Sequence, residues 1–316
     1  MAIKTIFITS GTSYTIPSDF VSLVSVEAIG AGGGSYTGTK APGSGGGAYA
    51  KITSLVNATP GYVYTTNIGA GGLSGTITTA GGDTQFIDGL AGSTPLKAVG
   101  GIGSNGSTGG SGGLSSNCIG MVVYSGGNGG AATTTSKGGG GGAAGPGGNG
   151  GRGGTGSGSN LLSSGAGGGG GAGSLLAAGS NGSNATTSVG GNGGLDGASS
   201  TVGTGANSST AATSGTGGSG GGGGFGNSGF GQGGNGGSSL VTWTATDGST
   251  AGSGGGGGGS IDNTLASGLP GTYGGGCGGS GLLADVSTLT GGNGIIIFTY
   301  VAAAPTVNSN FFFLFG

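Results

Sequence analysis

Apolar and polar residues alternate with the period of a β-strand in several segments of this chain. Between residues 21 and 29, Val24, Val26 and Ala28 alternate with residues that would face the other side of a sheet. Similar runs of β-branched and aromatic residues, bounded by Gly and Pro, predict further strands at residues 3–8, 12–16, 45–56, 61–69, 83–87 and 96–101. The pattern therefore predicts an all-β domain, with no significant α-helix.

The same alternation returns far along the chain, in "GIIIFTY" at residues 294–300. Ile295 and Ile297 would lie on one face of this strand, and Ile296 and Phe298 on the other. An isolated apolar strand would have nothing else to bury it, so we expect it to return to the first sheet. The expected domain is β-sandwich-like, consists of residues 1–100 with 294–301, and is closed by this last strand.

Glycine dominates the region between these strands and often recurs with a period of three. The chain holds 97 Gly but only 7 Pro in 316 residues, which argues against collagen. Polyproline-II geometry has three residues per turn and no internal hydrogen bonds, and only glycine lets such rods approach closely enough to bond to each other. Residues 101–293 are therefore predicted to form an inserted bundle of polyglycine-II rods, glycine-rich and of the polyproline-II type, joined by variable loops.

The third position of each glycine triplet indicates which rods face solvent. In "GGNGGRGGTGSG" at residues 147–158, Asn149, Arg152 and Thr155 occupy that position and are expected to line an exposed edge. Rods surrounded on all sides should contain only glycine, as at residues 167–171 and 254–259.

The composition excludes several kinds of chemistry. There is no histidine, and the eight acidic residues are scattered singly, so we expect no enzyme, no cofactor and no metal site. A net charge of -2 gives no electrostatic basis for binding nucleic acid or an anionic membrane, and no apolar stretch is long enough to span a bilayer. We also find no secretory signal. Cys118 and Cys277 could form one bridge or remain thiols.

Most large side chains of the glycine-rich region lie in the loops between the glycine runs, and two interpretations stay open. These residues could form small apolar clusters that cap the rods, or they could be displayed on a rigid scaffold for recognition. The candidates for receptor binding are Leu161, Leu176, Asn184, Leu240, Val241, Trp243, Asp247, Ile261, Asp262, Leu265, Leu282 and Leu283.

A family resemblance follows from the order of these motifs. The succession "TIPSDFVSLVSVEAIGAGGGS", "GSGGGAYAKITSLVNATPGYVYTTNIGAGG" and "GGDTQF", ending in "GGNGIIIFTY", resembles the glycine-rich domain of bacteriophage tail fibres and virion appendages. The middle region is more loosely similar to the polyglycine-rod adhesins at the tips of T-even-like phage fibres, in which loops at the end of the rods bind a receptor on the host outer membrane.

This resemblance implies a non-enzymatic virion protein that is made in the host cytoplasm. Its partners would be other virion proteins, copies of itself, or a receptor on the host cell surface. Two alternatives remain: a purely structural virion component, such as a head-decoration or fibre protein, and a cellular glycine-rich extracellular filament or matrix protein.

The last segment, residues 302–316, ends in a run of large apolar side chains after a polar spacer. Such a run is costly to expose to water, so we predict that it docks onto the protein's own sheet or onto another subunit. The residues involved are Phe311, Phe312, Phe313, Leu314 and Phe315.

Overall fold

The structure is a computed structural model, and the part of the chain that it describes is interrupted by several short gaps. It describes residues 1–90, 92–133, 135–159, 162–172, 178–186, 189–195, 212–215, 220, 225–226, 234–237, 242–260, 268–280 and 289–304. Within these ranges the protein is all-β, as predicted, and one turn of 3-10 helix, η1 (Ser115–Asn117), is its only helical element. In the part of the chain that the structure describes, no helix has the length and apolar character needed to cross a membrane.

Five antiparallel strands form the first sheet, in the order β1-β14-β3-β4-β8. Their bounds are β1 (Ala2–Ile8), β14 (Ile295–Ala302), β3 (Phe20–Ile29), β4 (Tyr49–Ile52) and β8 (Val122–Tyr124). The last strand lies between β1 and β3, so its expected return to the first sheet is observed. The contribution of β8, from within the glycine-rich region, was not expected from the sequence.

A second antiparallel sheet shares a core with the first. Its order is β2-β5-β6-β7, with β2 (Ser13–Thr15), β5 (Val63–Asn67), β6 (Thr84–Asp88) and β7 (Ser93–Ala98). Val26 and Phe298 of the first sheet and Tyr64 and Phe86 of the second are fully buried in one hydrophobic cluster. The aromatic rings of Tyr64 and Phe86 stack at 4.6 Å between centroids. Burial of this apolar surface holds the two sheets together.

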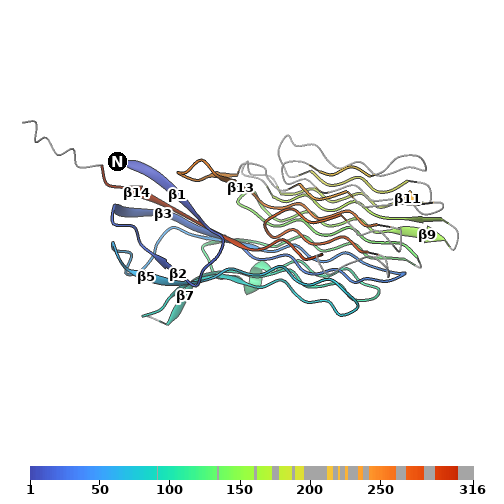
Figure 1. Ribbon diagram of the computed structural model, residues 1–316, viewed down its shortest axis with the longest axis horizontal. Helices are drawn as coiled ribbons and strands as arrows, with labels where there is room; N and C mark the ends of the chain where they lie inside the picture. The colour runs from blue at the N-terminus through green and yellow to red at the C-terminus, as the bar shows by residue number, and fades with distance from the viewer. Residues whose placement is uncertain are drawn as a thin grey trace, which may run out of the picture.

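The other face of the first sheet contacts the glycine-rich part. Ile29, Ile295 and Ile297 from this face form a second buried cluster with Ala143 and Ala144, which end a glycine segment. The partly buried Trp243 also packs there, from a small hairpin of β12 (Trp243–Thr244) and β13 (Thr250–Ala251). Figure 1 shows the two large sheets at one end of the molecule and the glycine segments side by side along its long axis. The distal end carries β9 (Ser157–Ser159), β10 (Leu162–Ser164) and β11 (Phe225–Gly226).

Residues 138–144 lie at the centre of the glycine-rich part and are completely buried. Their seven N–H groups donate to three neighbouring segments in rotation, so that every third residue donates to the same neighbour. The N···O distances of these bonds, and of those that the carbonyl groups of this segment accept, are 2.7 to 3.1 Å. The accepting segments are residues 41–47, 151–154 and 254–257. A rotation with period three means that the segment completes one turn every three residues.

The carbonyl groups of residues 138–143 accept hydrogen bonds with the same period, but from three different segments. The donors belong to residues 127–130, 169–172 and 276–279. Residues 138–144 are thus hydrogen-bonded to six neighbours. A Cβ built on Gly141 would lie 2.0 Å from the carbonyl oxygen of Gly127, so a side chain at this position has no room.

The glycine segments extend beyond the range expected from the sequence. Residues 30–34 and 43–47, which lie between β3 and β4, bond to segments of the glycine-rich region; for example, the Gly43 N–H donates to the Gly130 carbonyl over 3.0 Å. The burial pattern agrees with the prediction for the two pure-glycine runs, residues 167–171 and 254–259, which are buried throughout.

Candidate functional site

Most of the receptor-binding candidates lie outside the described residues. This holds for Leu161, Leu176, Leu240, Val241, Ile261, Asp262, Leu265, Leu282 and Leu283, and also for the terminal residues Phe311, Phe312, Phe313, Leu314 and Phe315. Asn184, Trp243 and Asp247 are described, and they occupy two separate surfaces. Trp243 and Asp247 lie beside the first sheet, whereas Asn184 lies on the side of the glycine segments.

Trp243 belongs to a hydrogen-bonded network centred on Glu27 of β3. Its indole Nε1–H donates to Glu27 Oε2 over 3.1 Å, and the Tyr49 hydroxyl donates to the same oxygen over 2.6 Å. The Ser25 hydroxyl donates to Oε1 over 3.0 Å, and Lys51 Nζ lies 3.4 Å from that oxygen. Burial and the neighbouring Glu27 carboxylate raise the pKa of the Tyr49 hydroxyl far above its usual range. The network satisfies a buried carboxylate and anchors the hairpin to the sheet, so Trp243 serves packing at this position.

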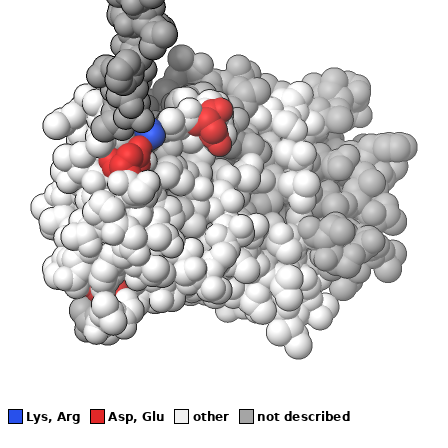
Figure 2. Space-filling model, turned by 60° about the vertical axis from the view of Figure 1, so that its left-hand side comes forward, with Lys and Arg blue, Asp and Glu red and all other residues white. Residues whose placement is uncertain are grey.

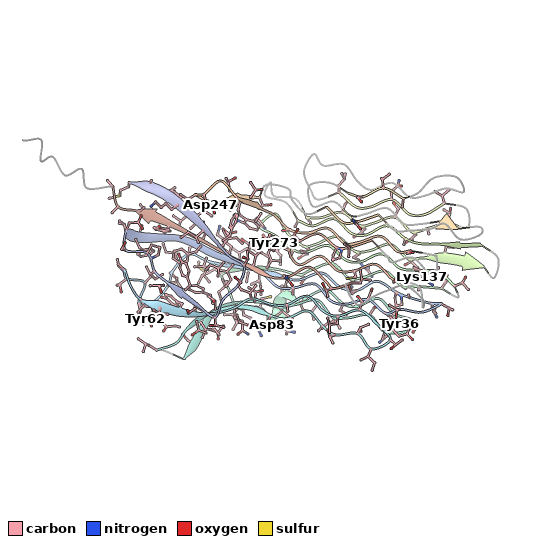
Figure 3. All side chains as sticks on the ribbon, in the orientation of Figure 1. Tyr36, Tyr62, Asp83, Lys137, Asp247 and Tyr273 are labelled. Atoms are coloured by element: carbon pink, nitrogen blue, oxygen red, sulfur yellow. The ribbon has the colours of Figure 1, made fainter. Side chains whose placement is uncertain are left out.

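Asp247 forms the turn of the same hairpin (Figure 3). Its Oδ1 accepts hydrogen bonds from the Ser249 hydroxyl over 2.6 Å and from the Ser249 N–H over 2.9 Å, and these bonds lower the pKa of the Asp247 carboxyl. Gly248 completes the turn with φ +86°, a conformation that favours glycine. The Thr246 N–H donates to the Thr5 carbonyl over 2.9 Å and so fastens the turn to the edge strand β1.

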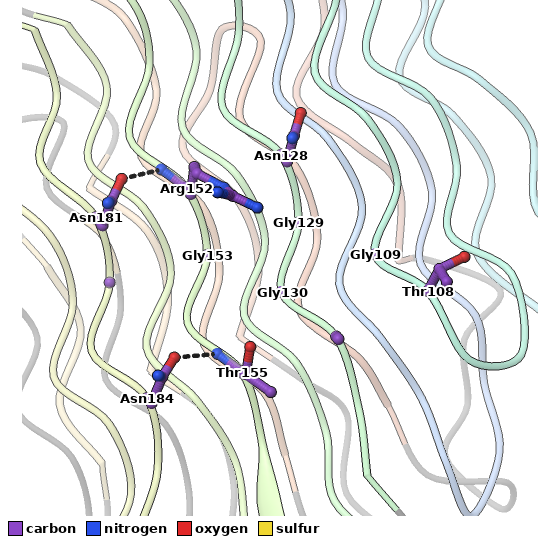
Figure 4. Close-up of a pocket in the computed structure, with 12 residues that line it drawn as sticks. Thr108, Gly109, Asn128, Gly129, Gly130, Arg152, Gly153, Thr155, Asn181 and Asn184 are labelled. Carbon is purple, nitrogen blue, oxygen red and sulfur yellow. Dashed lines mark hydrogen bonds between the residues drawn. The ribbon is translucent and has the colours of Figure 1, made fainter.

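A shallow depression of about 500 Å³ lies on the side of the glycine part, over four neighbouring segments (Figure 4). Its floor is glycine backbone, and its rim carries polar side chains from the third positions of the glycine triplets. The polar lining residues are Thr108, Asn128, Arg152, Thr155, Asn181 and Asn184. Arg152 and Asn149 are exposed and Thr155 is half-buried, so the exposed edge predicted from the triplet pattern is observed.

The asparagines on this face hold backbone groups of the adjacent segment. The Asn181 Oδ1 accepts the Arg152 N–H over 2.9 Å, and the Asn184 Oδ1 accepts the Thr155 N–H over 2.7 Å. Asn128 and Asn149 accept the N–H groups of the next segments in the same way, both over 2.8 Å. We call these four residues the asparagine ladder. Each one accepts an N–H that donates to no backbone carbonyl among the described residues, so the side chain satisfies a group that the packing of the segments leaves open.

Two members of this ladder are named from the sequence, Asn149 on the exposed edge and Asn184 in a loop, whereas Asn128 and Asn181 are not. Their signal was present, because Asn128 is preceded by two glycines and followed by two more, and Asn181 is followed directly by glycine. The same triplet logic that placed Asn149 on an exposed edge applies to the "GGNGG" at residues 126–130.

Charge is distributed unevenly over the described residues. The five acidic side chains lie in the strand-rich part or its hairpin, and on the face seen in Figure 2 the charged atoms gather over that end. Three ion pairs join described residues: Lys4–Asp19, Lys51–Glu27 and Lys97–Asp83. Arg152 belongs to none of these ion pairs. Its side chain is exposed, and it is the one cationic residue among the described residues that line the depression.

Lys137 is a second cation of the glycine part, but it is buried. Its side chain is 1% exposed, and Nζ donates to the Thr39 carbonyl over 2.6 Å. Burial disfavours the charged form and lowers the pKa of the ammonium group to about 8. Lys137 faces the interior of the bundle and lies apart from the depression.

Both cysteines are free thiols, which settles the alternatives left open by the sequence. Cys277 is fully buried, and Cys118 is partly exposed. Within the described ranges, no three His, Cys, Asp or Glu side chains gather in a way that could hold a metal ion. No family model matches the sequence, and no curated protein matches it either.

Proposed function

We propose that the glycine segments are polyglycine-II rods. The support comes from residues 138–144, whose N–H and C=O groups rotate with period three among six neighbours. Three residues per turn with all backbone bonds directed outward is the geometry of a left-handed polyproline-II helix. Dense hydrogen bonding between rods is the main term that can offset the entropy lost on ordering so much glycine, since glycine has no side chain to bury.

We further propose that the two large sheets form a β-sandwich closed by β14, into which the rod bundle is inserted. The shared hydrophobic cluster and the central position of β14 in the first sheet support this arrangement. Both ends of the inserted region are then fixed to one domain, which restricts bending of the rods relative to the sheets.

The function that this architecture supports best is that of a bacteriophage virion appendage protein, a tail fibre or fibre-tip adhesin. The observation that carries the proposal is the bundle itself: a scaffold whose central segment is held by backbone bonds to six neighbours, with polar side chains such as Asn149 and Arg152 exposed along its side. Such a scaffold presents surfaces at a fixed distance from its attachment, which suits recognition of a host surface more than catalysis. The absence of histidine from the whole chain also agrees with a non-enzymatic role.

The experiment that tests this proposal is immunogold labelling of purified virions with antibodies against the folded protein. A few labels per particle at the tail support the appendage. In that case an excess of the folded protein should reduce the adsorption of virions to host cells, whereas an excess of the heat-unfolded protein should not. Dense labelling of the head supports the alternative of a structural decoration protein. Particles without label would refute a virion role and favour the cellular filament or matrix protein.

A further inference from the structure

We propose that the depression on the glycine face binds an anionic saccharide, held by the Arg152 guanidinium and by the amide nitrogens of Asn128, Asn181 and Asn184. This inference rests on the proposed function, because it names the class of ligand that one surface of the appendage would recognise. The surface lies on the side of the rods, and Thr108 at its edge belongs to the turn at residues 105–108 (Figure 4).

The lining of the depression offers hydrogen-bond donors and positive charge. The three asparagines use their Oδ1 atoms to accept backbone N–H groups, and the hydrogen bonds among the described residues leave their Nδ2 groups free to donate outward. Arg152 adds a guanidinium without an ion pair among these residues, and none of the described residues that line the depression carries a carboxylate. A surface of this kind is complementary to carboxylate or phosphate groups and to their neighbouring hydroxyl oxygens.

The donors are also held in place before any ligand arrives. Each amide is fixed by its bond of 2.7 to 2.9 Å to the neighbouring segment, so its rotation is restricted when the protein folds and not when the ligand binds. The floor consists of glycine backbone that is itself bonded to other segments, for example Gly153 N–H to the Asn128 carbonyl over 2.8 Å. Binding therefore requires little additional ordering of the protein.

The shape and chemistry of the depression favour an extended saccharide over other partners. The Arg152 guanidinium and the three asparagine amides are spread across three segments, so a single small anion cannot reach them all. Among the described residues, no aromatic or large aliphatic side chain lines the depression, so this lining offers no apolar pocket for the anchor residues of a protein partner. One arginine is also far fewer cations than a nucleic-acid site needs.

The test measures binding of the full-length protein to three immobilised probes. Oligogalacturonate carries carboxylates, phosphorylated mannan carries phosphates, and dextran is neutral. We expect binding to at least one anionic probe, weaker binding at higher salt and no binding to dextran. The two anionic probes distinguish a uronic acid from a sugar phosphate as the source of the charge. Equal binding to dextran, or no binding to either anionic probe, would overturn the proposal.

Two variants and one control locate the site. Arg152→Gln should weaken binding by about 10-fold or more, because it removes a charge-assisted donor. Asn184→Asp keeps the oxygen that accepts the Thr155 N–H but replaces the Nδ2 donor with negative charge, so it should weaken binding while the melting temperature stays unchanged. Lys40→Gln removes the same charge as Arg152→Gln from a site outside the depression and should bind like the wild type.

The outcomes also separate this inference from the proposed function. If Arg152→Gln and the wild type bind the anionic probes equally, or if Lys40→Gln is weakened as much as Arg152→Gln, the saccharide site is wrong. Labelling of virion tails can then still support the appendage. If virions carry no label but the Arg152 variant loses saccharide binding, the appendage proposal fails and the saccharide site stands.

Discussion

The strongest test of the packing argument is the substitution Gly141→Ala at the centre of the bundle. Gly141 lies within the segment that contacts six neighbours, and its added methyl group would meet the Gly127 carbonyl oxygen at 2.0 Å. Contacts of a Cβ below 3.0 Å essentially do not occur, so the two segments must together move apart by about 1 Å.

That movement stretches three hydrogen bonds of the buried bundle. They are Gly141 N–H to Ser44 O over 2.8 Å, Gly276 N–H to Gly141 O over 2.8 Å, and Gly46 N–H to Gly127 O over 2.9 Å. Half of this separation on each segment, an additional ~0.5 Å, lengthens all three beyond about 3.2 Å, where such bonds are lost. At ~1 kcal/mol each, the loss is about 3 kcal/mol. Alanine restricts the unfolded chain and offsets ~0.4–1 kcal/mol, so we expect a net loss of about 2–3 kcal/mol.

The assay is urea-induced unfolding of the wild type, Gly141→Ala and the control Gly106→Ala. Gly106 also belongs to the glycine-rich part, but its added methyl group would contact only the Tyr36 ring, at 3.9 Å. The control should stay within ~0.5 kcal/mol of the wild type. The reasoning is refuted if Gly141→Ala is as stable as the wild type, or if both variants lose the same free energy of unfolding.

Three further predictions concern buried polar groups. Trp243→Phe removes the donor to Glu27 and should lower the free energy of unfolding by about 1–2 kcal/mol; an unchanged urea midpoint would contradict the proposed anchoring. Burial lowers the pKa of Lys137 from 10.5 to about 8, so between these values the unfolded chain holds a proton that the folded protein has released. The free energy of unfolding of the wild type should therefore rise from pH 8 toward 10.5 relative to that of Lys137→Met, which lacks this proton. Parallel pH profiles of the two proteins would refute the lowered pKa of Lys137. Burial raises the pKa of the Cys277 thiol to about 12, so at pH 8 a thiol reagent should modify only Cys118 until the protein unfolds; rapid modification of both would contradict the burial of Cys277.

The sequence predicts the strands well because their faces differ in burial. Val26 and Phe298 alternate with polar or differently packed neighbours, and this period of two identifies both β3 and β14. It misses β8, which is three residues long and too short to show a period. The sequence also gives no sign of the hairpin at residues 243–251, because its strands are only two residues long and its position depends on contacts with the first sheet.

The candidate surface was predictable in part. Triplet spacing places Asn149 and Arg152 on an exposed edge, since with three residues per turn every third side chain points the same way. The bonds made by Asn181 and Asn184 could not be predicted, because they depend on which segments are neighbours. Segments far apart in the sequence, such as residues 138–144 and 254–257, lie next to each other, and identical glycines give no signal for that choice.

The period of three in the hydrogen bonds also constrains how the length of this protein can change. An insertion of three residues within a buried segment returns every later residue to its original side and shifts it along the axis by one turn. In a segment that carries a side chain at every third position, such as residues 147–158, an insertion of one or two residues turns the later side chains inward, where a Cβ would meet a carbonyl at about 2 Å, as it would at Gly141. Segments of this kind can thus lengthen or shorten only in whole turns. The loops that join them have no such restriction, so the ends of the bundle can vary freely in length while its interior cannot.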